Sequence, residues 1–253
     1  MTDAVLTSAE DGVLTITINR PEAKNAINRA AADGLAAALD ELDGNDDLRV
    51  GILTGAGGTF CSGMDLKAFL QGELPVVKGR GFGGLTEAPP VKPLIAAVDG
   101  YALAGGMELA IACDLIVANR EAKFGIPEVK RGLAAAAGGL MRLPRQINPR
   151  LAMELALTGE FIDAERAHAI GLINHITFGA AIEGAKELAA KITANGPLAV
   201  RLSKQVMVGS ENWSNTEMWA KQNEVISPIF TSEDAREGAA AFAQKRKPEW
   251  TGK

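Results

Sequence analysis

The 253-residue sequence predicts an α/β fold with an all-helical C-terminal segment. Residues 13–19 alternate between apolar and polar side chains, which is typical of a half-buried strand, and residues 29–43 carry Ala and Leu at helical spacing. A buried strand follows at 49–54, and strand, helix, strand in succession indicates an α/β core. Beyond residue 195 only helical patterns remain. We therefore expect a core over residues 1–195 and a helical segment over residues 196–253.

The first half of the chain predicts a hairpin, a helix and two strands. A turn at Asp11-Gly12 joins the two strands of a hairpin within residues 5–19. Gly44-Asn45 ends the helix over 29–43, and glycines at 55–58 end the strand over 49–54. Residues 71–93 are rich in Gly and Pro and are expected to form an irregular loop beside a ligand site.

The second half alternates strands and helices before becoming helical throughout. Strands are expected at 94–98 and 115–118, with a short helix opened by Gly105 between them. Helices at 150–158 and 163–170 precede a short strand at 172–176 and a long helix at 179–194. Asn195-Gly196-Pro197 then breaks the chain, and helices are expected at 198–208 and 211–230.

Composition excludes several classes of protein. A net charge of −5 gives no electrostatic basis for binding nucleic acid. The two cysteines, Cys61 and Cys113, predict no disulfide framework, and with only two histidines no metal-ligand spacing occurs. The first residues lack the basic and apolar regions of a leader peptide, and no apolar run is long enough to cross a membrane. We expect a soluble, cytoplasmic protein with no metal and no membrane partner.

Residues 98–114 are the centre of the chain's expected chemistry. Gly105-Gly106 at the start of a helix allows close approach of a ligand to free N–H groups. Glu108 lies in the first turn of that helix, so a donor for a developing oxyanion and a carboxylate come together. The alternative is a Gly-Gly turn needed only for tight packing, with Glu108 as a partner of the helix dipole.

Two other segments carry candidate functional residues. In residues 60–67, Gly63 can leave the Met64 N–H unpaired while Asp65 caps the next helix. Lys67 in that first turn opposes the helix dipole, which suits a phosphate-bearing ligand; otherwise it is an ordinary surface lysine. Pro127 could fix the position of Glu128, although Pro-Glu is also a common helix start.

Several further patterns carry no functional prediction. Residues 79–84 match G-x-G-x-x-G, but without a preceding strand and a following helix they do not indicate a dinucleotide site. The small residues at 132–140 predict a packed turn and a helix start, since no Gly-Lys-Ser/Thr follows. His168 and His175 lack an evident partner and are interpreted as structural.

The motifs together resemble the crotonase, or enoyl-CoA hydratase/isomerase, superfamily. The resemblance runs through nearly the whole chain, over residues 19–26, 60–67, 98–114, 124–128 and 165–173. It implies a spiral of repeated ββα units followed by a C-terminal helical trimerisation segment. It also implies an acyl-CoA thioester as substrate, no cofactor other than the coenzyme A of that substrate, and a homotrimer or a hexamer built from two trimers.

The same resemblance assigns roles to individual residues. The N–H groups of Met64 and Gly105 match the family's oxyanion hole, and Glu108 and Glu128 match the two acid–base glutamates of its hydratases. The expected contacts with coenzyme A are Lys24, Ala26, Met64, Asp65, Leu66 and Lys67. Met64 replaces a frequent Ala, and Ala134 to Ala137 replace a stretch where Pro is frequent, which obscures the acyl chain length.

Three functions remain open from the sequence. The first is hydration of a trans-2-enoyl-CoA, which needs one carboxylate to activate water and an acid to protonate the α-carbon. The second is Δ3-Δ2-enoyl-CoA isomerisation with one glutamate, or another acyl-CoA lyase reaction of the family. The third is a non-catalytic acyl-CoA-binding protein. Retention of both glutamates favours the hydratase.

Overall fold

A six-stranded sheet forms the centre of the computed structural model, which describes residues 3–253. The strands lie in the order β1 (Val5–Glu10), β2 (Val13–Ile18), β3 (Val50–Gly55), β6 (Leu94–Val98), β8 (Leu115–Asn119) and β11 (His175–Thr177). β1 and β2 are the predicted antiparallel hairpin, and every later pairing in the sheet is parallel. The predicted α/β architecture is therefore confirmed.

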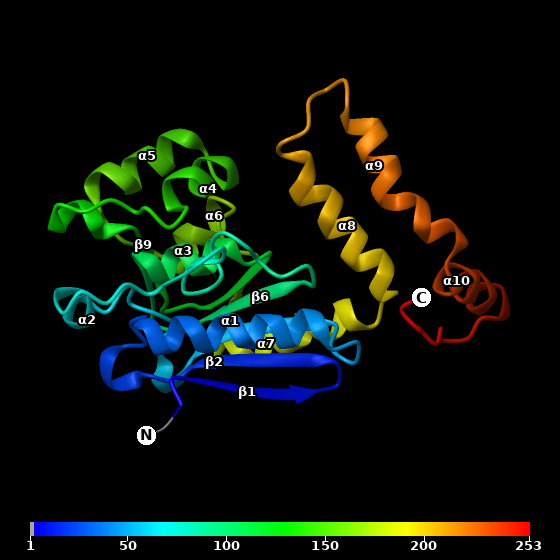
Figure 1. Ribbon diagram of the computed structural model, residues 1–253, viewed down its shortest axis with the longest axis horizontal. Helices are drawn as coiled ribbons and strands as arrows, with labels where there is room; N and C mark the ends of the chain where they lie inside the picture. The colour runs from blue at the N-terminus through cyan, green and yellow to red at the C-terminus, as the bar shows by residue number, and fades with distance from the viewer. Residues whose placement is uncertain (1–2) are drawn as a thin grey trace.

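Helices cover both faces of this sheet (Figure 1). α1 (Arg29–Gly44) and α3 (Gly105–Ala112) contribute to the larger apolar cluster, and α7 (Ala181–Thr193) closes the smaller one on the other face. β3 contributes to both clusters: Ile52 belongs to the smaller cluster under α7, and Leu53 belongs to the larger one. Successive side chains of a strand point to opposite faces, so a strand covered on both sides is apolar throughout.

Two small sheets lie outside the predicted elements. β7 (Tyr101–Leu103), β9 (Lys123–Gly125) and β10 (Ile162–Asp163) form a three-stranded sheet in the order β10-β9-β7. β4 (Val76–Val77) pairs with β5 (Gly81–Phe82) inside the segment expected to be irregular. Strands of two or three residues are too short to give a periodic pattern, so their partners in space define them.

The remaining elements of the core are short helices. They are η1 (Pro21–Ala23), η2 (Ala56–Gly58), α2 (Leu66–Leu70), η3 (Pro127–Arg131), α4 (Gly139–Gln146), α5 (Pro149–Thr158) and α6 (Ala164–Ala169). Asp65 caps α2 by accepting hydrogen bonds from the Lys67 and Ala68 N–H groups, as predicted. The expected strand at 172–176 is shifted, since β11 begins only at His175.

The C-terminal helices stand beside the α/β body. α8 (Pro197–Ser210) and α9 (Met218–Ile226) form an antiparallel pair, followed by η4 (Ser227–Thr231) and α10 (Glu233–Gln244) (Figure 1). The Lys204 Nζ of α8 lies 2.6 Å from the Asp114 carboxylate and so links the pair to the body. The residues of both apolar core clusters come from before position 196. The division at 195 stays a prediction.

The expected continuous helix over 211–230 is wrong. Residues 211–217 form a turn, α9 begins at Met218, and a 3-10 turn starts at Ser227 next to Pro228. The Ser214 hydroxyl donates a hydrogen bond to Glu217 Oε2 at 2.5 Å, which competes with helical hydrogen bonding. Among residues 3–253, no helix combines the length and apolar character that crossing a bilayer requires.

Candidate active site

The first residues of α3 pack tightly against the segments that contain Cys61 and Phe82. The preceding residue, Ala104, has φ +52° and ψ −127°, an uncommon conformation for a residue with a side chain. A Cβ on Gly106 would collide with the Cys61 carbonyl, and one on Gly105 would lie 2.5 Å from Cζ of Phe82. Packing therefore requires both glycines, which supports the tight-packing interpretation without excluding the chemical one.

The Met64 N–H lies close to this helix start. Ile27 donates to the Gly63 carbonyl at 2.8 Å and accepts from Asp65 at 2.9 Å, so the intervening Met64 N–H points away from Ile27. A Cβ on Gly63, whose φ is +106°, would lie 3.3 Å from the Gly105 nitrogen. Within residues 3–253, neither the Met64 nor the Gly105 N–H donates a hydrogen bond. The two expected oxyanion donors are thus unpaired neighbours.

Glu108 is a buried carboxyl group held by the N-terminus of another helix. The residue is only 3% exposed, and its Oε1 accepts a hydrogen bond from the Gly139 N–H at 2.8 Å. The pKa of Glu108 is raised to about 7, mainly by burial, and the charge of Glu128 acts in the same direction. The N–H groups of Gly139 and Ala137 and the charge of Arg142 act in the opposite direction. Such a group can carry or release a proton near neutral pH.

Glu128 lies in the electrostatic neighbourhood of Glu108. It belongs to η3, where Pro127 occupies the first turn, and burial raises the pKa of its carboxyl group. Its Oε2 is buried and has no hydrogen-bond partner among the described residues. A buried carboxylate oxygen without a partner is costly, and a bound substrate or water would supply one. The predicted glutamates are therefore brought together, although residues 109–127 separate them in sequence.

The segments expected to bind coenzyme A also lie side by side. Ser62 donates to the Lys24 carbonyl at 3.1 Å, and Arg20 donates to the Ala26 carbonyl at 2.5 Å. Arg20 also pairs with the Asp65 carboxylate at 2.9 Å, so that side chain is already occupied by Arg20 and by its capping bonds. Leu66 and Lys67 are exposed, and Lys24 Nζ lies 5.5 Å from the centre of the Tyr101 ring.

Other sequence features lie away from this centre. His168 and His175 are exposed. Gly81, Gly83 and Gly84 pack against Thr86, Leu109 and α1, respectively, and do not open a helix. Cys61 and Cys113 are buried free thiols. Among residues 3–253, no group of His, Cys, Asp and Glu side chains is placed to hold a metal ion.

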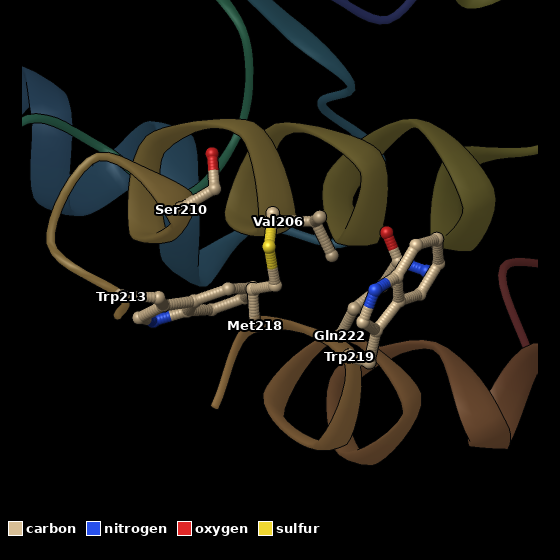
Figure 2. Close-up of a pocket in the computed structure, with 6 residues that line it drawn as sticks. All are labelled: Val206, Ser210, Trp213, Met218, Trp219 and Gln222. Carbon is tan, nitrogen blue, oxygen red and sulfur yellow. The ribbon is translucent and has the colours of Figure 1, made fainter. Parts of the chain in front are cut away.

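A hollow between α8 and α9 is also separate from the glutamates. Its lining is mainly apolar and consists of Val206, Ser210, Trp213, Met218, Trp219 and Gln222 (Figure 2). None of these side chains is an acid or a base near neutral pH. The hollow therefore offers no group for acid–base chemistry.

Comparison with known proteins agrees with the predicted family. The family model described as enoyl-CoA hydratase/isomerase matches residues 8–253. The chain belongs to the enoyl-CoA hydratase/isomerase family.

Relatives of known structure and sequence span the whole chain. The crystal structure of enoyl-CoA hydratase EchA1 from Mycobacterium marinum is 60% identical, covers 99% of this chain and 100% of its own, and has a TM-score of 0.98. Enoyl-CoA hydratase EchA19 from Mycobacterium tuberculosis is 42% identical over 93% of this chain and 91% of its own. Carnitinyl-CoA dehydratase from Proteus mirabilis is 36% identical over the full length of both. The crotonase fold is therefore confirmed, and the chain is an enzyme of this family.

The residues that position the site through long-range contacts were not identified from the sequence. Gly139 donates to Glu108 from 31 positions away, Arg142 carries the nearby positive charge, and buried Asn25 ties two loops together. The Gly138-Gly139 pair after a run of alanines was the available signal, and it indicated only a packed turn. Long-range contacts of this kind give no local pattern.

Proposed function

We propose that this chain is an enoyl-CoA hydratase, which adds water reversibly across the 2,3 double bond of a trans-2-enoyl-CoA thioester. The oxygen of water bonds to C3 while one glutamate takes its proton. Electron density moves through C2 to the thioester oxygen, and the other glutamate delivers a proton to C2. The product is a 3-hydroxyacyl-CoA, and the glutamate pair has exchanged one proton for another.

The pair of buried glutamates is the observation that carries this proposal. Both carboxyl groups have raised pKa values, and the charge of Glu128 disfavours ionisation of Glu108. Two interacting carboxyl groups titrate as a unit, so one protonated and one ionised form can coexist near neutral pH. Hydration needs both forms at once.

The unpaired N–H groups of Met64 and Gly105 support the same reaction. They are close neighbours, and Gly105 is the first residue of α3, where the N-terminus of the helix favours negative charge. We propose that they donate hydrogen bonds to the thioester oxygen, whose negative charge grows as water attacks. Donors aimed at such an oxygen contribute about 3 to 4 kcal/mol to the transition state.

Binding of the coenzyme A portion is assigned to Lys24, Ala26, Met64, Asp65, Leu66 and Lys67. Lys24 and Lys67 offer positive charge for phosphates, and the Ile27–Met64 bridge holds the two segments together. The Asp65 side chain contributes indirectly, because it fixes Arg20 and caps α2. No cofactor besides the coenzyme A of the substrate enters the proposal.

Isomerisation of a 3-enoyl-CoA is the second candidate. It requires one glutamate to move a proton between C2 and C4, and the unpartnered Oε2 of Glu128 favours that residue for the role. Hydration is preferred because an isomerase has no use for the second buried carboxyl group. A non-catalytic acyl-CoA-binding protein would need neither.

The test is turnover of a panel of enoyl-CoAs by the purified protein and by Glu108→Gln and Glu128→Gln. We expect the hydration rate, followed by the loss of the enoyl thioester absorbance, to fall by about 10²-fold or more in each variant, because an amide cannot transfer the proton. A Glu108→Gln variant that hydrates at the wild-type rate contradicts the proposal. A variant that no longer hydrates but still isomerises 3-enoyl-CoA supports the second candidate.

A further inference from the structure

Arg142 lies in the first turn of α4, close to the Gly139 N–H that donates a hydrogen bond to Glu108. Its backbone N–H donates to the Gly138 carbonyl at 2.9 Å, and its side chain is half-buried. Its Nη2 donates a hydrogen bond to the Thr86 carbonyl at 2.5 Å. Within residues 3–253, no other side chain hydrogen-bonds to Thr86. A Cβ on Gly138 would collide with Nη1 of Arg142, so glycine at 138 makes room for the guanidinium.

The guanidinium therefore connects two elements that each contact the reacting groups. α4 donates the Gly139 N–H to Glu108 at 2.8 Å. Residues 82–86 lie over the start of α3, where Phe82 limits the space at Gly105 and Gly83 packs against Leu109. A shift of either element would move a carboxylate or an oxyanion donor.

The charges around Glu108 give Arg142 a second effect. Glu128 raises the pKa of Glu108, while Arg142 lowers it. Burial lowers the pKa of Arg142. Glu108 and Glu211 favour its charged form, and its neighbour Arg145 disfavours it. Arg145 pairs with Glu211 at 3.4 Å on the exposed side of the helix. Arg142 is the cation that lowers the pKa of Glu108, whereas Arg145 faces Glu211.

We propose that Arg142 is a positioning residue for hydration: its guanidinium fixes α4 against residues 82–86 and places a positive charge beside Glu108. It acts through Glu108 and Gly105 and does not itself touch the reacting atoms. The inference rests on the proposed hydratase function.

The test compares Arg142→Gln with Arg145→Gln, which removes the same charge from the same helix, and with Arg142→Lys. For Arg142→Gln we expect kcat to fall by about 10-fold or more with little change in KM, because substrate binding groups remain. We expect the apparent pKa of the pH-profile limb that Glu108 controls to rise by about 1 unit, because Glu108 loses its opposite charge. Arg142→Lys should keep this apparent pKa and lose kcat, and Arg145→Gln should match wild type.

Two results would overturn the inference. One is Arg142→Gln with the wild-type kcat and the wild-type apparent pKa for the limb that Glu108 controls. The other is Arg142→Lys with the wild-type kcat, which decides the question if Arg142→Gln does not fold. Carbon-13 NMR of glutamate labelled at the carboxyl carbon, with Glu108 assigned from Glu108→Gln, reports the same titration without turnover. A wild-type protein that hydrates nothing therefore rejects the hydratase proposal, while an unshifted Glu108 resonance in Arg142→Gln rejects the inference.

Discussion

At the scale of the residue, Glu108 combines catalytic potential with a cost to stability. A carboxyl group whose pKa is raised from 4.5 to about 7 on folding binds its proton more tightly in the folded chain. The free energy of unfolding is therefore unaffected below about pH 4.5 and decreases as the pH rises towards 7, where the buried group ionises. The same burial that prepares Glu108 for proton transfer destabilises the fold at neutral pH.

This cost predicts that Glu108→Gln is stabilised relative to wild type as the pH rises. Between pH 5 and pH 8 its advantage in the free energy of unfolding should grow by about 2 to 3 kcal/mol. Urea unfolding at the two pH values measures it, with Glu41→Gln on the exposed side of α1 as the control. An advantage of equal size at both pH values would show that ionisation is not the cause.

The two oxyanion donors predict opposite sensitivities to side-chain replacement. Met64→Ala should leave the hydration rate close to wild type, because the backbone N–H remains. Gly105→Val should lower it by about 10²-fold or more, since even a Cβ there would lie 2.5 Å from the Phe82 ring and displace the donor. Steady-state rates, with circular dichroism as the check on folding, decide this. A severe loss in a folded Met64→Ala contradicts a purely backbone role.

At the scale of the element, the loops around the coenzyme A segment depend on one buried amide. Asn25 is fully buried, accepts from the Arg20 N–H at 2.9 Å, and donates to the carbonyls of Ala56 at 2.8 Å and Thr59 at 2.5 Å. It thereby joins the loop before α1 to the loop after β3. Its positive φ of 55° is also a conformation that Asn tolerates better than most residues.

Asn25→Ala is expected to destabilise the protein by about 2 to 4 kcal/mol, because it leaves several buried polar groups unpaired. It should also raise KM, since the loop carrying Lys24 and Ala26 loses its anchor. Asn28→Ala is the control, because Asn28 only caps α1 through the Ala31 N–H and should cost about 1 kcal/mol. Urea unfolding and initial rates measure both. Equal losses of stability in the two variants would refute the anchoring role.

At the scale of the whole molecule, α8 to α10 expose large apolar side chains beside the core. Trp219 is 69% exposed and Phe230 is 78% exposed, in a segment that adds nothing to the two apolar clusters. Apolar surface of this kind usually marks an interface, and identical chains usually close symmetrically. We propose a homotrimer, or a hexamer built from two trimers.

If this apolar surface of α8 to α10 forms the subunit interface, changing it should weaken oligomer assembly. Truncation after Asn195 should abolish assembly and reduce solubility, and Trp219→Glu together with Phe230→Glu should weaken assembly while the core stays folded. Leu157→Glu is the control, since Leu157 on α5 is 70% exposed but lies outside the C-terminal segment. Sedimentation at micromolar concentration measures the mass. A monodisperse wild-type monomer would falsify the proposal.

Local patterns in the sequence determined most of the secondary structure and the family. β2, α1 and β6 follow from periodicity and end signals, because the period of apolar residues depends only on neighbours in the chain. The motifs around Met64, Gly105, Glu108 and Glu128 were sufficient to predict the family before any contact was known. The prediction of a continuous helix at 211–230 failed because a turn that contains the Ser214–Glu217 hydrogen bond precedes α9, and a 3-10 helix follows it.

Only the tertiary structure decided the state of the site. The burial of Glu108, its hydrogen bond from Gly139, and the guanidinium of Arg142 each depend on segments that meet in space while lying about 30 residues apart. The same holds for β7, β9 and β10, which exist only as partners of one another. The sequence gives the identity of each residue, but the pKa of a carboxyl group depends on its desolvation and on the charges near it in the folded protein.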